Sequence, residues 1–183
     1  MDKLFKNNAY GILELFIEHP QENFSARGIA RKLNISHATV LSNLKHLAAL
    51  QLIRKKNALY PMYYANAEEP RYRAYKKNHI VFQIIASGLA EHLQKQTLAS
   101  CLVLFGSCAK GTFTEESDID IFAEAKETKV IVASFEKKLH RKINLLYEPD
   151  LNGLSEELRN NIANGIVLYG FIKCQNFPSL RKA

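Results

Sequence analysis

The chain of 183 residues has few cysteines and no long apolar segment. Its three cysteines, Cys101, Cys108 and Cys174, are odd in number and form no C-x-x-C pair, which argues against a disulfide framework and a zinc site. No apolar run approaches the roughly 20 residues of a membrane-spanning helix. The amino-terminal residues lack the apolar region of a signal peptide. We therefore expect a cytoplasmic protein with reduced thiols and no membrane contact.

The composition also excludes disordered and repetitive architectures. Apolar residues make up 47% of the chain and charged residues 23%, close to the averages for folded soluble proteins. At roughly 100 to 200 residues per domain, this length allows one domain or two small ones. The sequence therefore predicts a globular protein with a buried core.

The positive charge is concentrated in the first part of the chain. Residues 1–78 contain 13 Lys and Arg against 6 Asp and Glu, a net charge of +7. Residues 79–183 contain 12 of each and are neutral. A basic segment attracts polyanions such as nucleic acid, although a solvated basic surface would look the same in the sequence.

Residues 1–66 show the order helix, helix, turn, helix and strand pair. A first apolar helical pattern ends at Glu18, and Ser25 and Ser36 stand where the N-caps of two more helices belong. Val40 and Leu44 begin the inward face of the third helix. Two strands should then flank a turn at Asn57-Ala58, and Pro61 predicts that the second is an edge strand.

This order resembles the winged helix-turn-helix family over about residues 5 to 66, although Gln51 stands where many members have glycine before the wing. The resemblance implies DNA binding, but such domains also serve as protein-protein or dimerisation modules. We call the two strands that flank the turn at Asn57-Ala58 the ribbon. The residues expected to contact DNA are Ser36, His37, Thr39, Ser42, Asn43 and Lys45 of the third helix and Arg54, Lys55 and Lys56 of the ribbon.

A polar linker and a long helix are predicted between the two halves. The linker ends at Pro70, and residues 71–95 contain no proline and one glycine, Gly88. A broad apolar face indicates a core helix that bridges the domains. The same face would also suit pairing with a second copy of the chain, and the sequence does not decide between these two roles.

The second half contains a pattern typical of a metal-nucleotide site. A buried strand over residues 101–105 is followed directly by Gly106-Ser107, and a second strand carries Asp118 and Asp120. Side chains two residues apart on a strand project to the same side, so both carboxylates can share Mg²⁺. The glycine and serine leave backbone N–H groups and a hydroxyl for a phosphate.

The glycine-serine followed by aspartate-x-aspartate resembles the signature of minimal nucleotidyltransferases in the DNA polymerase β-like superfamily, over about residues 98 to 172. The resemblance implies that Gly106 and Ser107 contact the phosphates of ATP or another NTP, and that Asp118 and Asp120 hold Mg²⁺ as one or two ions. Lys110 stands where such domains often have arginine, which makes it a candidate phosphate contact.

The chain departs from this pattern at the third carboxylate. Active members carry it on a later strand, where it ligates metal and helps to deprotonate the attacking hydroxyl, and the residue that aligns with it is Asn144. An amide is no useful base at neutral pH. Glu148 and Asp150 lie too far along the chain to replace it. We therefore expect Mg·NTP binding with transfer that is slow, absent or dependent on a partner.

The overall prediction is an α+β protein: residues 1–66 form the winged helix-turn-helix, 67–97 the linker and bridging helix, and 98–183 the nucleotidyltransferase domain. One interpretation is an antitoxin-like enzyme that transfers a nucleoside monophosphate to a hydroxyl of a helical toxin and represses its own operon. Another is a transcriptional regulator whose inactive second domain senses nucleotide. An enzyme that modifies small molecules is a weaker interpretation, because no appended substrate domain is apparent.

Overall fold

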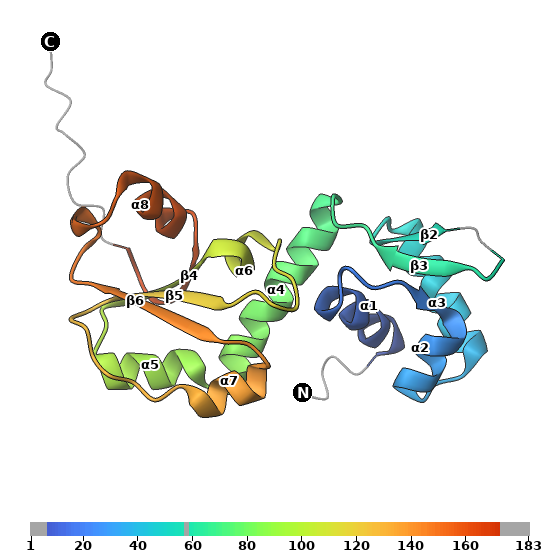
Figure 1. Ribbon diagram of the computed structural model, residues 1–183, viewed down its shortest axis with the longest axis horizontal. Helices are drawn as coiled ribbons and strands as arrows, with labels where there is room; N and C mark the ends of the chain where they lie inside the picture. Colours follow the sequence, from blue (N-terminus) through green and yellow to red (C-terminus); the bar gives the residue numbers. More distant parts are fainter. Residues whose placement is uncertain (1–6, 57–58, 173–183) are drawn as a thin grey trace, which may run out of the picture. The chain divides into compact units, whose positions relative to one another are not determined.

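A computed structural model describes residues 7–56 and 59–172, which form two sheets and eight α-helices (Figure 1). The fold class is therefore α+β, as the sequence predicts. Two compact units are present. The first comprises Met1–Phe82 and Lys110–Ser117, and the second comprises Gln83–Ala109 and Asp118–Ala183. None of the helices in the described part of the chain is long and apolar enough to cross a membrane.

The first unit begins with three helices whose ends follow the capping residues of the sequence. They are α1 (Asn8–Glu18), α2 (Ala26–Leu33) and α3 (His37–Ala49). Ser25 Oγ accepts a hydrogen bond from Gly28 N at 3.1 Å, and Ser36 Oγ accepts one from Thr39 N at 3.0 Å. Both residues are N-caps, which confirms the predicted helix starts.

A three-stranded antiparallel sheet completes this part of the unit. Its strands are β1 (Phe24–Ser25), β2 (Ile53–Lys56) and β3 (Met62–Ala65), in the order β1-β3-β2. The predicted edge position of the second ribbon strand is wrong, because β1 pairs with β3 on its other side. Pro61 lies just before β3, so its missing N–H interrupts no strand pairing. The predicted turn at Asn57-Ala58 lies outside the described residues.

Gln51 connects α3 to β2 in a left-handed backbone conformation, with φ of 60°. This conformation is costly for a residue with a β-carbon, and glycine adopts it freely. We expect Gln51→Gly to raise the free energy of unfolding by about 1 kcal/mol in urea titrations. Asn34→Gly, also at positive φ, should gain less because asparagine tolerates this region. A loss of stability in Gln51→Gly would mean that the Gln51 side chain contributes more than its backbone strain costs.

The predicted single helix over residues 71–95 is two helices, α4 (Pro70–Ser87) and α5 (Leu89–Thr97). Gly88 separates them with a positive φ of 83°, which an uninterrupted right-handed helix cannot contain. Phe82 is the last α4 residue of the first unit, and Gln83 is the first residue of the second unit.

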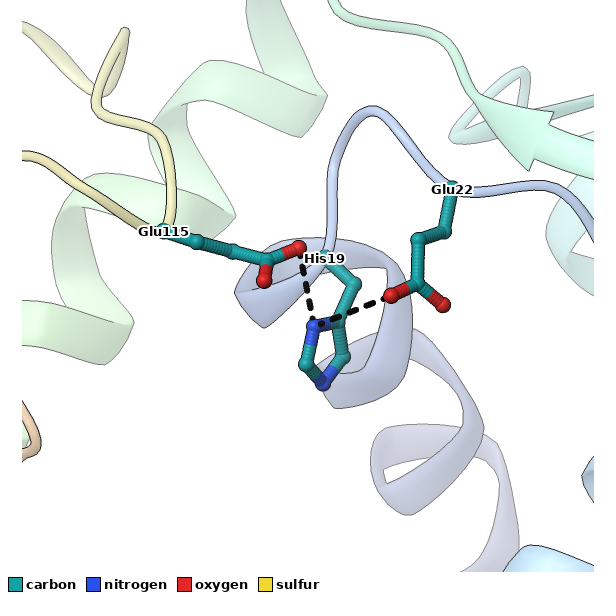
Figure 2. Close-up of side chains that lie close together, drawn as sticks. All are labelled: His19, Glu22 and Glu115. Atoms are coloured by element: carbon teal, nitrogen blue, oxygen red, sulfur yellow. Dashed lines mark ion pairs between the residues drawn. The ribbon is translucent and has the colours of Figure 1, made fainter.

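The loop 110–117 belongs to the first unit, where three contacts hold it. The buried Lys76 of α4 donates a hydrogen bond to the carbonyl oxygen of Phe113, and its ammonium lies 4.3 Å from the centre of the Phe113 ring. Gly111 has φ of 71°, and a β-carbon there would collide with the carbonyl oxygen of Arg73. His19 Nδ1 lies 2.9 Å from an oxygen of Glu115 (Figure 2).

The second unit is a four-stranded mixed sheet in the order β6-β5-β4-β7. Its strands are β4 (Cys101–Phe105), β5 (Ile119–Glu124), β6 (Ile143–Glu148) and β7 (Ile166–Gly170). The pair β5 and β6 is parallel, whereas β4 pairs antiparallel with β5 and β7. Helices α5 and α7 (Ala133–Leu139) cover one face, and α8 (Glu156–Ala163) covers the other (Figure 1).

The segment just before α7 contains a run of β-branched residues. Residues 129–132 are not helical, and α7 begins at Ala133. Val130, Ile131 and Val132 are consecutive β-branched residues, which lose side-chain freedom in a helix and disfavour its start.

The thiols of the described residues, Cys101 and Cys108, are both buried, and Cys174 lies outside the described residues. Burial, and secondarily the charge of Glu124, raises the pKa of the Cys101 thiol. This keeps Cys101 protonated and makes it a packing residue of the sheet core.

Candidate functional site

Gly106 lies at the point where β4 ends and the short helix α6 (Gly106–Lys110) begins. The antiparallel register of β4 and β5 places the preceding residue, Phe105, opposite Asp120. A β-carbon on Gly106 would lie 2.5 Å from Asp120 Oδ2, and the φ of Gly106 is 70°. Both space and backbone conformation therefore require glycine beside this carboxylate.

Asp118 and Asp120 lie at the start of β5, which begins at Ile119. Both are half-buried, and the backbone oxygen of Asp118 accepts a hydrogen bond from the thiol of Cys108 at 3.3 Å. This contact connects α6 to the residue before β5. The half-buried Ser107 and the exposed Lys110 stand at the two ends of the same short helix.

Asn144 is the residue that the parallel register of β5 and β6 places beside Asp120. Its amide Nδ2 donates to Asp118 Oδ2 and to Asp120 Oδ1, each at 3.1 Å. The two carboxylates therefore converge on one point, where the hydrogens of the amide carry partial positive charge. Sequence reasoning aligned Asn144 with this position but missed its role as a donor to both aspartates.

Glu148 and Asp150 do not enter this cluster. Glu148 pairs with Glu124 at the opposite end of β6 from Asn144. Asp150 caps a 3₁₀ turn, η2 (Leu151–Gly153), where its Oδ1 accepts a hydrogen bond from Asn152 N at 2.6 Å. The third position of the site is therefore an amide.

The donor set of this site fits a hard divalent cation. Asp118 and Asp120 offer carboxylate oxygens, which Mg²⁺ prefers, together with the oxygens of water and phosphate. The missing β-carbon of Gly106 lets the Asp120 carboxylate lie against the backbone at the start of α6. Mg²⁺ held there would neutralise phosphate charge and orient an NTP.

The residues predicted to contact DNA fall into two sets. Three of them form local hydrogen bonds of α3: Ser36 caps the helix and its hydroxyl lies 2.8 Å from that of Thr39, and Asn43 Nδ2 donates to Thr39 O at 2.8 Å. The others are exposed on α3 or β2, namely His37, Ser42, Lys45, Arg54, Lys55 and Lys56. Within the first set, Ser36 is exposed, and Thr39 and Asn43 are half-buried.

Comparison with known families finds one similarity, in the carboxy-terminal half of the chain. Residues 87–171 match the family described as Polymerase beta, Nucleotidyltransferase. The match covers α5 to β7 and includes Gly106, Asp118, Asp120 and Asn144. This part of the chain is therefore similar to the nucleotidyltransferase family. No curated protein matches the chain.

Proposed function

We propose that the protein is a DNA-binding regulator whose nucleotidyltransferase domain binds Mg·NTP. The observation that supports this proposal best is the convergence of Asp118 and Asp120 on a single point beside Gly106. Ser107 and the amino-terminal N–H groups of α6 would face the phosphates. Lys110 would add a positive charge at the end of the same short helix.

The amide of Asn144 favours binding over rapid transfer. In an active centre a base must take the proton of the attacking hydroxyl, and an amide cannot do so at neutral pH. Asn144 also gives each aspartate a hydrogen-bond donor, which holds the pair together before a metal arrives. A metal that binds these same two oxygens, Asp118 Oδ2 and Asp120 Oδ1, would displace this donor.

Transfer of a nucleoside monophosphate to a partner hydroxyl is a second proposed function, in which the protein acts as an antitoxin. It is favoured by the two carboxylates, which converge beside Gly106 and would hold the metal ion of a metal-assisted transfer. In this case the partner would be a protein such as a helical toxin, and one of its side chains would supply the missing base. Transfer of the label from labelled ATP to a co-purified partner protein would support this function.

Calorimetric titration with ATP and Mg²⁺ tests the nucleotide site. We expect the wild type to bind and Asp118→Ala/Asp120→Ala to lose measurable binding, because the double variant has no carboxylate left to hold the metal. Glu156→Ala/Glu157→Ala is the matched control: it removes the same charge from the exposed first turn of α8. If the double variant binds as tightly as the wild type, the proposed site is wrong.

The proposed DNA contacts predict a steep salt dependence. The first unit contains the basic ribbon strand with Arg54, Lys55 and Lys56, all exposed. Gel shifts with a duplex from the chain's own upstream region should weaken with salt. The steepness of this loss is the slope of the logarithm of the binding constant against the logarithm of the salt concentration. Replacing all three residues with alanine should reduce the magnitude of this slope by about 0.9 for each phosphate that the variant can no longer neutralise.

The matched control for this experiment removes three exposed lysines of the second unit, Lys126, Lys129 and Lys137. It changes the net charge equally, so its slope should stay close to that of the wild type. Equal slopes for the ribbon variant and the wild type would contradict DNA binding through β2.

A further inference from the structure

The solvent-facing side of α3 contains a leucine among its polar residues. Val40, Leu44 and Leu47 are buried against the unit, whereas His37, Ala38, Leu41, Ser42 and Lys45 are exposed. Leu41 is 43% exposed. A single exposed leucine is common in proteins and needs a second observation before it indicates a binding role.

The second observation is a groove of about 600 Å³ against which Leu41 lies. The groove is lined by residues of β1, α2, α3, β2 and β3 and of the segment just before β3, among them Arg27, His37, Leu41, Lys55, Tyr60 and Met62. Leu59 and Tyr60, at the same end of the ribbon, are 91% and 72% exposed. Three of the four large exposed apolar side chains described in the first unit are therefore found at or next to this groove.

The charged side chains of the groove indicate which kind of ligand it would bind. Arg27 and Lys55 line it and no carboxylate does, and among the described residues neither has an ion-pair partner. An apolar wall with unpaired cations suits a ligand that combines phosphate with an apolar group. Double-stranded DNA offers both in its major groove, where the C5-methyl of thymine is the apolar group of the base edges.

We propose that Leu41 recognises the methyl group of a thymine in double-stranded DNA, while Arg27 and Lys55 contact the neighbouring phosphates. This inference rests on the proposed DNA binding and adds a determinant of sequence specificity. Neither Leu41 nor Arg27 was among the residues predicted from the sequence. The predicted set contained polar and basic side chains only, whereas the position of Leu41, four residues after His37, places it on the exposed side.

The test begins with selection of duplexes from a random library by the full chain. Each thymine of the enriched duplex is then replaced in turn by deoxyuridine, which removes only the methyl group. We expect the wild type to lose roughly fourfold in affinity at one position or more, as burial of a methyl group implies. Leu41→Ala should bind the thymine and uracil duplexes equally, and Leu41→Met should retain the discrimination.

Lys55→Ala separates specificity from general DNA affinity. It should weaken binding to both duplexes by the same factor and leave their ratio unchanged, because a phosphate contact does not recognise a base. Circular dichroism melting of each variant checks that it is folded. Equal binding of thymine and uracil duplexes by the wild type, or discrimination that survives in Leu41→Ala, would overturn the role of Leu41.

Two outcomes distinguish this inference from the function on which it rests. If the chain retards DNA but enriches no sequence, DNA binding stands and methyl recognition by Leu41 is wrong. If the chain retards no DNA at low salt, both proposals fail, and an apolar protein segment becomes the better occupant of the groove.

Discussion

Replacing Gly106 with alanine is expected to reduce the affinity for Mg·ATP by about 100-fold or more, because the new β-carbon would lie 2.5 Å from Asp120 Oδ2 and displace this carboxylate. The substitution also strains the backbone at φ of 70°, which should lower the free energy of unfolding by about 1–2 kcal/mol. Calorimetry measures the first effect, and urea unfolding measures the second.

Gly88→Ala is the matched control for this strain. Gly88 has φ of 83°, but nothing lies within 4 Å of a β-carbon built there. The Gly88 variant should therefore show a similar loss of stability and retain nucleotide binding. If both variants retain binding, the position of the Asp120 carboxylate against Gly106 is not required for nucleotide binding.

Asn144→Asp is expected to have the second large effect. A third carboxylate at a position 3.1 Å from both aspartates adds negative charge where the cation binds. The affinity for Mg²⁺ in the presence of ATP should rise by about tenfold or more. Without Mg²⁺ the three carboxylates repel one another, so the variant should unfold at a lower temperature than the wild type.

Asn144→Ala removes the amide without adding charge and is the control for this prediction. It should not raise the affinity for Mg²⁺ as the aspartate does. Transfer from labelled ATP should increase only in Asn144→Asp, because only that variant regains a carboxylate base. Faster transfer by the wild type than by Asn144→Asp would contradict the assignment of Asn144 to the third position.

Local sequence signals predicted most of the helices and strands. Serine caps at Ser25, Ser36 and Ser155 mark the starts of α2, α3 and α8, because each side chain accepts a hydrogen bond from a backbone N–H three residues on. A buried apolar run likewise predicted β4. These features depend on neighbouring residues alone.

Features that depend on distant parts of the chain were not predicted. The central place of β3 arises from its pairing with Phe24 and Ser25, nearly forty residues away in the sequence. The attachment of the loop 110–117 to α4 likewise follows from packing between distant segments. Sequence alignment placed Asn144 opposite the aspartates, but the direction of its hydrogen bonds required the structure.

The attachment of the loop 110–117 has a consequence for the order in which the chain folds during synthesis. The amino-terminal unit includes residues up to Ser117, so it cannot be completed when its helices first leave the ribosome. Until then the ammonium of Lys76 lacks the carbonyl of Phe113 that it meets in the folded unit. A gene truncated near residue 97 would therefore produce a less stable fragment than one truncated after the whole sheet of the second unit.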